Sequence, residues 1–344
     1  MTDTQPDEEL NASEKRFSFA RFMLRVLVVI TLLGGVAGGA GYYWLKLISV
    51  QPGPHDSYTL FVVKKGAGRI QLKHDLMRAG VISEPFHYHL VSLFHAADYM
   101  PKAGEYRIPP GASLRQILAL FDSGRTYQRR VTILEGWRSV DVMKALNSAE
   151  ALESVVLRPP AEGSVFPDTY FYSHGDDRRA LVQRMQRKME ITAAEIWSNR
   201  QEGLPLRSVD ELIILASMIE KETGMDAERG LVSSVFINRL NRGMRLQSDP
   251  TVAYGLAGDG PLPEALSRDD LRITHGWNTY RKKGLPKTAI ANPSQASLYA
   301  AAHPDTSDYL YFVADAKGGH LFARTLAEHN RNVRLYRKRR AQSE

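Results

Sequence analysis

The chain has 344 residues, which is long enough for two domains that each bury a hydrophobic core. It contains no cysteine, so disulfide bonds and thiolate metal sites are excluded. Its formal net charge of +7 suits anionic partners, although many soluble proteins carry a similar charge.

An apolar segment near the N-terminus is long enough to cross a bilayer. Residues 26–45 are 20 consecutive uncharged residues, and a helix of that length spans about 30 Å. Aromatic residues of the kind found at membrane interfaces close the segment, namely Tyr42, Tyr43 and Trp44. Basic residues precede it, namely Lys15, Arg16, Arg21 and Arg25. The positive-inside rule therefore predicts a single transmembrane helix with residues 1–25 in the cytoplasm and the remainder outside.

The alternative is a cleaved signal peptide. The apolar run is too long for one, and it follows an extended polar segment. That polar segment is acidic at its start and poor in apolar side chains, so the cytoplasmic tail of residues 1–25 is predicted to be disordered.

Residues 57–128 contain the same order of predicted elements twice: a strand, a turn at a glycine, a helix, and a glycine that ends the helix. The two copies and a helical segment between them cover residues 58–80, 84–98 and 106–124. We expect a small α+β module, and this repeated pattern resembles the LysM carbohydrate-binding module. The alternative is a generic strand–helix pair. His87 and His89 do not share a helix face at this spacing, so no metal site is predicted there.

Residues 131–340 are predicted to form a larger mixed α+β domain. A strand and turn open it at 131–137, after which Ser139 caps a helix. A polar and aromatic loop over 162–172 precedes a charged amphipathic helix over 180–196.

A helix predicted over residues 208–224 organises this domain. Ser208 and Glu211 form a capping box at its start, and Gly224 can end it in the left-handed conformation. Apolar residues cover nearly its whole circumference, which predicts that the helix is buried.

Glu220 lies on a narrow face of this helix that carries small residues. Side chains lean toward the helix N-terminus, so Ala216 and Ser217 lie beneath the Glu220 carboxyl and leave a groove. A carboxyl in an apolar wall has a raised pKa and can act as a general acid near neutral pH. The alternative is that Glu220 is the first solvated residue after an apolar helix. Glu222 points to the opposite side and is predicted to be a surface charge.

Residues after this helix supply further helices and several polar loops. Asp226 is predicted to cap a helix that ends at Gly243, and Asp249 to cap the next one. Loops rich in amide and aromatic side chains follow over 273–280 and 284–293.

The last part of the chain predicts a hairpin and a helix. The hairpin joins 309–313 to 320–323. Thr325 and Glu328 form a capping box, and the basic run 331–340 is typical of a solvated helix face.

Motifs spread over residues 216–322 match the motifs of one protein family and occur in the same order as in that family. They are Ala216-Ser-Met-Ile-Glu-Lys-Glu-Thr223, Val235-Phe-Ile-Asn-Arg-Leu240, Gly243-Met-Arg-Leu-Gln-Ser-Asp-Pro-Thr-Val252, Asn278-Thr-Tyr280, Gly284-Leu-Pro286, Ile290-Ala-Asn-Pro293, Ala301-Ala-His-Pro304, Tyr309-Leu-Tyr-Phe-Val-Ala314 and Gly318-Gly-His-Leu-Phe322. Together they resemble the endolytic murein transglycosylase family, also called MltG or YceG-like. The resemblance covers roughly residues 55–340, and the apolar segment and the LysM-like module lie where that family has them.

The resemblance implies a lyase that cuts glycan strands of peptidoglycan internally, between N-acetylmuramic acid and N-acetylglucosamine. Cleavage leaves 1,6-anhydro-N-acetylmuramic acid ends, and no cofactor or metal is implied. The family's catalytic glutamate matches Glu220. The predicted substrate-binding residues, each of which also has a structural interpretation, are Ser217, Gln247, Asp249, Asn278, Tyr280 and His320.

This chemistry suits a site with one essential acid. Ordinary glycosidases use two carboxyls, whereas in the lytic reaction the C6 hydroxyl of the sugar attacks its own anomeric carbon. Glu220 would act first as acid and then as base. A hydrolase that admits water is one alternative, with Asp168 or Asp249 as second carboxyl. A non-catalytic glycan-binding scaffold of the envelope is the other.

The predicted partners are peptidoglycan glycan strands and the inner membrane. Peptidoglycan synthases are a further candidate, and nucleic acid is not expected. The resemblance and the charge bias together predict an inner-membrane protein with its catalytic domain in the periplasm.

Overall fold

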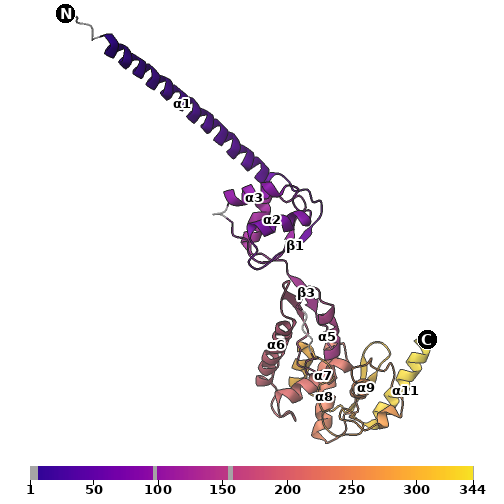
Figure 1. The fold of residues 1–344 in the computed structure, drawn as a ribbon. Helices are drawn as coiled ribbons and strands as arrows, with labels where there is room; N and C mark the ends of the chain where they lie inside the picture. The colour runs from indigo at the N-terminus through magenta and orange to yellow at the C-terminus, as the bar shows by residue number, and fades with distance from the viewer. Residues whose placement is uncertain (1–6, 96–98, 154–157, 344) are drawn as a thin grey trace, which may run out of the picture. The chain divides into compact units, whose positions relative to one another are not determined.

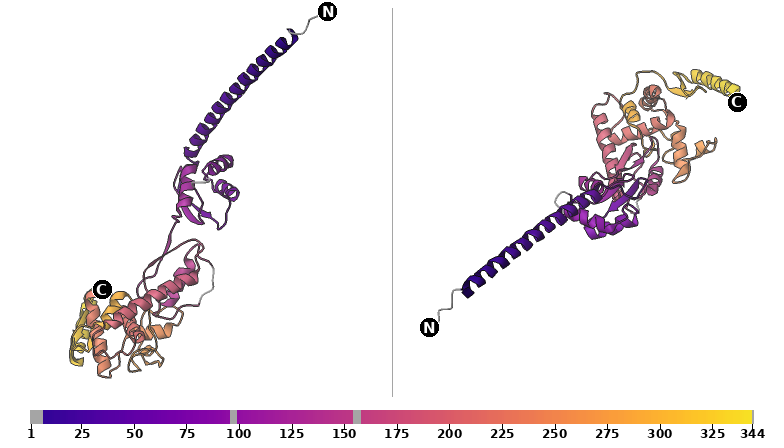
Figure 2. Two further views of the ribbon diagram at one scale, coloured as in Figure 1. Left: turned by 90° about the vertical axis from the view of Figure 1, so that its left-hand side faces the viewer. Right: turned by 90° about the horizontal axis from the view of Figure 1, so that it is seen from above.

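The computed structural model describes residues 7–95, 99–153 and 158–343. The chain divides between Tyr127 and Gln128 into two compact units (Figures 1 and 2). The described residues form many helices and three two-stranded antiparallel sheets, so the predicted α+β class is confirmed.

The first unit begins with one long helix, α1, from Asp7 to Val50 (indigo in Figure 1). Its segment Arg21–Val50 has a mean hydropathy of 2.0 in its most apolar window and is exposed there, which makes it a candidate membrane span. Residues 7–25, which the sequence predicts to be disordered, belong to this helix. Extending an existing helix costs much less than nucleating one, so the apolar helix continues into the polar segment. Residues 1–6 lie outside the described residues.

The rest of this unit is a two-stranded sheet with three short helices. The elements are β1 (Thr59–Val63), α2 (Arg69–Arg78), α3 (Pro85–Phe94), β2 (Gly104–Ile108) and α4 (Leu114–Ser123). β1 pairs antiparallel with β2, with Phe61 opposite Tyr106. The helix predicted over 84–98 ends at Phe94, and residues 96–98 lie outside the described residues.

The core of the first unit includes the end of α1. Phe61, Tyr88 and Tyr106 are buried with aliphatic residues of α2 and α4, and Ile48 of α1 is buried in the same cluster. The ring centroids of Phe61 and Phe121 lie 5.6 Å apart in a stacked arrangement. The apolar helix is therefore fixed to the module by packing and not only by a linker.

The second unit opens with its own small sheet. β3 (Arg129–Thr132) pairs antiparallel with β4 (Thr169–Tyr172), and α5 (Ser139–Ser148) and α6 (Arg178–Ser198) bury apolar side chains with them. The segment 162–172, predicted as a loop, therefore ends in a strand. Its alternating burial explains the difference, since Tyr170 and Tyr172 face the core.

The largest core of the second unit surrounds α7 (Val209–Glu222). α6, α8 (Asp226–Asn241) and α10 (Gln295–Ala302) contact it, and Leu212, Leu215 and Met218 are fully buried. The prediction of a buried helix that is apolar nearly all round is confirmed.

Shorter elements complete the second unit. They are α9 (Asp249–Ala257), the 3-10 turn η1 (Asp270–Arg272), the hairpin β5 (Tyr311–Ala314) and β6 (His320–Ala323), and α11 (Leu326–Ser343). The predicted hairpin is confirmed, as is the capping box at Thr325: its Oγ1 accepts from Glu328 N at 3.2 Å, and the Glu328 carboxylate accepts from Thr325 N at 3.3 Å.

Helix ends differ from the prediction by a residue or two. The sequence predicts Ser139, Asp226 and Asp249 as N-caps, but each is the first residue of its helix and the preceding residue is the cap. Their side chains have other partners; the Ser139 hydroxyl, for example, donates to the Ala161 carbonyl at 3.3 Å. Gly224 does not end α7, because Thr223 already leaves the helix in an extended conformation.

Candidate active site

The candidate site lies at the C-terminal end of α7, where two glutamates are separated by Lys221. Ser208 holds the other end, since its Oγ accepts from Glu211 N at 3.2 Å. The Glu211 carboxylate accepts from Arg207 N at 2.8 Å, one residue earlier than a capping box requires. Glu220 and Glu222 lie two residues apart, so their side chains leave the helix about 200° apart and meet different surroundings.

Glu220 faces the start of α10. Its Oε2 accepts from Ser294 N at 2.9 Å and from Ser294 Oγ at 2.5 Å. Its Oε1 lies 3.7 Å from the guanidinium of Arg229, and the side chains of Glu220 and Arg229 are only 6% and 7% exposed. Glu220 thus holds the N-terminus of α10 beside a buried cation, and both of its oxygens have protein partners.

Glu222 faces a cavity of about 520 Å³. The predicted role of Glu222 as a surface charge is wrong, because α7 is packed on nearly all sides and its opposite face meets other protein segments. Its Oε1 accepts from Ser248 Oγ at 2.6 Å. The pKa of Glu222 is raised to about 7, mainly by burial and to a smaller extent by nearby Asp249, while the hydrogen bond from Ser248 and the charge of Arg239 oppose the rise. At neutral pH a substantial fraction of Glu222 is therefore protonated.

The cavity joins segments that are far apart in the sequence. Its described lining comprises Glu222, Arg239, Leu246, Gln247, Asp249, Tyr280, Tyr311, Phe312, Val313, Leu326, His329 and Asn330. It therefore contains three predicted substrate-binding residues, Gln247, Asp249 and Tyr280, together with the first turn of α11.

Hydrogen bonds between two loops bring these three residues together. Ser248 N donates to Thr279 Oγ1 at 2.9 Å, and Gln247 N donates to the Thr279 carbonyl at 3.2 Å. The Tyr280 hydroxyl donates to Asp249 Oδ1 at 2.5 Å. Gln247 adopts a φ of +53°, an uncommon left-handed conformation for a residue with a side chain, and its side chain is exposed at the cavity.

Arg239 supplies positive charge to the same cavity. Its Nε donates to the Leu310 carbonyl at 2.6 Å and its Nη1 to the Leu246 carbonyl at 2.6 Å, which fixes the side chain. The guanidinium carbon lies 5.1 Å from the ring centroid of Tyr311. Burial lowers the pKa of Arg239, but from so high a value that it stays cationic at neutral pH.

Two of the predicted substrate-binding residues, Ser217 and Asn278, are fully buried among other parts of the protein. Ser217 is fully buried, and its Oγ accepts from Ile290 N at 3.1 Å. Asn278 is fully buried, and its amide donates to the Leu271 and Ile273 carbonyls at 3.1 and 2.6 Å. Neither side chain is exposed to solvent or lines the cavity. Their polar groups satisfy backbone atoms of neighbouring loops, which sequence pattern does not separate from ligand binding.

His320 lies outside the cavity. Its Nδ1 is 2.7 Å from Glu228 Oε2, and its ring packs edge-on against Phe312, which does line the cavity. Asp168, a candidate second carboxyl, forms an ion pair with Lys188 on α6. Among the described residues, no cluster of three or more histidine or acidic side chains is suited to a metal ion.

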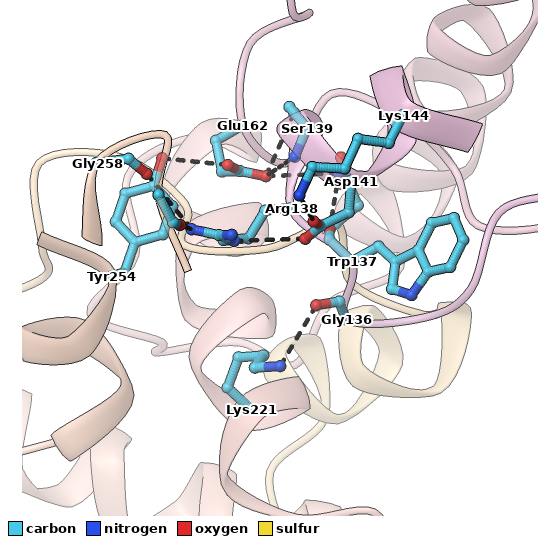
Figure 3. A network of polar contacts seen from close by, with 12 residues as sticks. Gly136, Trp137, Arg138, Ser139, Asp141, Lys144, Glu162, Lys221, Tyr254 and Gly258 are labelled. Carbon is cyan, nitrogen blue, oxygen red and sulfur yellow. Dashed lines mark hydrogen bonds and ion pairs between the residues drawn. The ribbon is translucent and has the colours of Figure 1, made fainter. Parts of the chain in front are cut away.

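A second polar network anchors the segment between β3 and α5 (Figure 3). Glu162 Oε1 accepts from Ser139 N at 2.9 Å, and its Oε2 accepts from the Tyr254 hydroxyl of α9 at 3.1 Å. Arg138 donates to the Gly260 carbonyl at 2.9 Å, beyond the end of α9. These contacts fix α9 at Tyr254 and just after its C-terminal end.

Asp249 also borders a second cavity of about 300 Å³. Its lining is mainly apolar and includes Pro250, Leu262 and Leu266, with Lys221 at its edge. The two cavities share Asp249 as a lining residue.

Comparison with known proteins places the chain in a family. The YceG-like family model matches residues 61–335. The chain belongs to the YceG-like family. The family predicted from the sequence motifs is therefore confirmed, and most of both units lies within the match.

Relatives of this YceG-like protein share its sequence over most of its length. An endolytic murein transglycosylase of Bacillus subtilis strain 168 is 29% identical over 344 residues, covering 88% of this chain and 91% of the relative. One of Streptococcus pneumoniae strain D39 is 27% identical and covers 91% of this chain, which spans 64% of the streptococcal protein. A crystal structure of a YceG-like protein from Listeria monocytogenes, 25% identical, aligns with 80% of this chain and 99% of its own at a TM-score of 0.50.

Several residues that line the cavity were not predicted from the sequence pattern. Glu222, Arg239, Tyr311 and Phe312 line the cavity, but none is among the residues predicted to bind substrate. A signal for Glu222 was available: a helix that is apolar nearly all round must be covered on every side, so a charge on its far face also meets protein.

Proposed function

We propose that this YceG-like protein is an endolytic lytic transglycosylase of peptidoglycan, with Glu222 as its acid. The observation that supports this most is a partly buried carboxyl whose pKa is raised to about 7, in a cavity with Gln247, Asp249 and Tyr280. The Bacillus and Streptococcus relatives carry the name of that activity. A general acid works best when its pKa lies near the working pH.

The reaction proposed is an intramolecular displacement at the anomeric carbon of N-acetylmuramic acid. Protonated Glu222 gives its proton to the glycosidic oxygen, and the bond from the anomeric carbon to that oxygen breaks. The C6 hydroxyl of the same sugar forms the new bond to the anomeric carbon, and its proton goes to the Glu222 carboxylate. The acid is regenerated, no water is consumed, and the product carries a 1,6-anhydro end.

The other polar residues of the cavity suit sugar binding. Gln247 exposes an amide that can donate to and accept from hydroxyl groups. Tyr280 and Asp249 hold one another, which fixes their orientation before substrate arrives. The two cavities that share Asp249 offer room for more than one sugar of a glycan strand.

In this proposal Glu220, the acid predicted from the sequence, has a supporting role. Its oxygens are occupied by Ser294 and Arg229, so proton transfer to a sugar would first require these contacts to break. We propose that Glu220 positions α7 against α10. The prediction that Glu220 is the acid remains the competing assignment.

A hydrolase is the second candidate function, and one observation favours it. Asp249 lines the same cavity as Glu222, so a second carboxyl is available to activate water. Mass spectrometry of the products from isolated sacculi separates the two reactions, with heat-inactivated protein as the control. The proposal predicts anhydro ends, whereas new reducing ends without anhydro ends would show hydrolysis.

We also propose a membrane topology and separate roles for the two domains. Residues 26–45 span the inner membrane, with residues 1–25 in the cytoplasm and the catalytic domain, residues 131–340, in the periplasm. The charge bias around α1 supports this orientation. The LysM-like module of residues 57–128 holds glycan without taking part in the chemistry.

A further inference from the structure

One helix of the first unit has an exposed apolar face and contains no Asp, Glu, Lys or Arg. This helix is α3, Pro85–Phe94. Phe86 is 61% exposed, and Leu93 and Phe94 are each 48% exposed. Helix faces that meet water normally carry charges, so this surface differs from an ordinary solvated face.

The same helix contacts the aromatic end of the candidate membrane span. The rings of Phe94 and Tyr42 lie edge to face with centroids 5.8 Å apart, and the His87 and Trp44 rings do so at 5.5 Å. Figure 1 shows α3 beside the end of α1, with β1 further from it. Along the axis of α1, α3 therefore lies at the same height as the last residues of the candidate membrane span.

The connection between α1 and the module keeps α3 at this level. Ile48 is buried in the module's core, one helical turn or about 6 Å beyond Trp44. With so short a distance, the module cannot move away from the bilayer while α1 stays inserted. Tyr and Trp side chains at the end of a span lie at the level of the lipid headgroups.

We propose that α3 lies in the bilayer interface, with Phe86, Leu93 and Phe94 inserted among the lipid headgroups beside the end of α1. Aromatic side chains are enriched at this boundary, and α3 carries no Asp, Glu, Lys or Arg. The partner is the lipid surface, and α3 forms a second contact with it in addition to the span. The module is then held against the membrane instead of turning freely above it.

The absence of cysteine allows a direct test in the full-length chain in lipid nanodiscs. A single Phe94→Cys variant is labelled with the polarity-sensitive fluorophore NBD. Leu60→Cys is the matched control, because Leu60 is also apolar and 45% exposed but lies on β1. Phe86→Cys is a second reporter on α3, and circular dichroism checks that each labelled protein is folded.

The label at Phe94 should emit at shorter wavelength than the label at Leu60. Lipids with a nitroxide near the headgroup should quench it strongly, while aqueous iodide should quench it weakly. The proposal is overturned if iodide quenches the labels at Phe94 and Phe86 as strongly as the label at Leu60 and the nitroxide lipids do not quench them. Equal lipid quenching at all three positions would also overturn it, since the label itself would then be causing insertion.

Discussion

Replacing Glu222 by glutamine should change how stability depends on pH. Burial raises the pKa of Glu222 from 4.5 to about 7, so between these values the folded chain binds a proton that the unfolded chain releases. The free energy of unfolding of the wild type therefore falls as pH rises through this interval. One pKa unit corresponds to about 1.4 kcal/mol, so the full fall attributable to Glu222 is about 3 kcal/mol.

The Glu222→Gln variant lacks this pH-dependent loss of stability, so its stability relative to the wild type should increase as the pH rises. We expect the difference in free energy of unfolding between variant and wild type to shift by up to about 3 kcal/mol from pH 5 to pH 8. For a unit of this size that is roughly 6–12 °C in melting temperature. Tryptophan fluorescence is a suitable readout, because Trp137, Trp197 and Trp277 all lie in the second unit.

The measurement uses the full chain in detergent, with melting curves at pH 5 and pH 8. Glu190→Gln controls for the loss of one negative charge, since the Glu190 side chain is 71% exposed on α6. A difference between Glu222→Gln and wild type that is the same at both pH values would refute the reasoning about the cavity. So would a wild type that gains stability relative to the variant at pH 8.

Three further predictions concern the supporting structure. Asn278→Ala should lower the free energy of unfolding by about 2–4 kcal/mol, because two buried carbonyls lose their donor; calorimetry checks this, and a stable variant with lost activity would indicate a ligand role instead. Protease added to intact spheroplasts should digest the part of the chain after α1, and protection until lysis would contradict the proposed orientation. A membrane-anchored chain without residues 57–128 should keep some cleavage of sacculi but bind glycan less tightly, whereas a folded protein of this kind with no activity at saturating substrate would show that the module is needed for chemistry.

Local signals predicted much of the fold. The hairpin of β5 and β6 and the burial of α7 each depend on residues close together in the sequence, and each is confirmed. Capping side chains were less reliable, because a hydroxyl or carboxylate near a helix start can bind a distant partner instead. Asp249 shows this, since its carboxylate accepts from Tyr280, 31 residues away along the chain.

The site was harder to predict because it depends on contacts between distant segments. A helical projection separated Glu220 from Glu222 correctly, but it carried no information on what packs against each face of α7. Glu220 meets Ser294 and Arg229, and Glu222 meets the loop that carries Ser248. Polar residues such as Asn278 looked like sugar ligands for the same reason, since their backbone partners become visible only in three dimensions.

The identity of the acid is tested most directly by Glu222→Gln and Glu220→Gln, measured side by side for anhydro ends released from sacculi. Glutamine at 222 keeps the shape but cannot give a proton, so the rate should fall by about 10²–10⁴ while the protein stays folded. Glutamine at 220 should lower stability, because it replaces the anion beside buried Arg229, yet the folded fraction should still form anhydro ends. The account is contradicted if Glu222→Gln forms anhydro ends at a near-normal rate while a well-folded Glu220→Gln forms none.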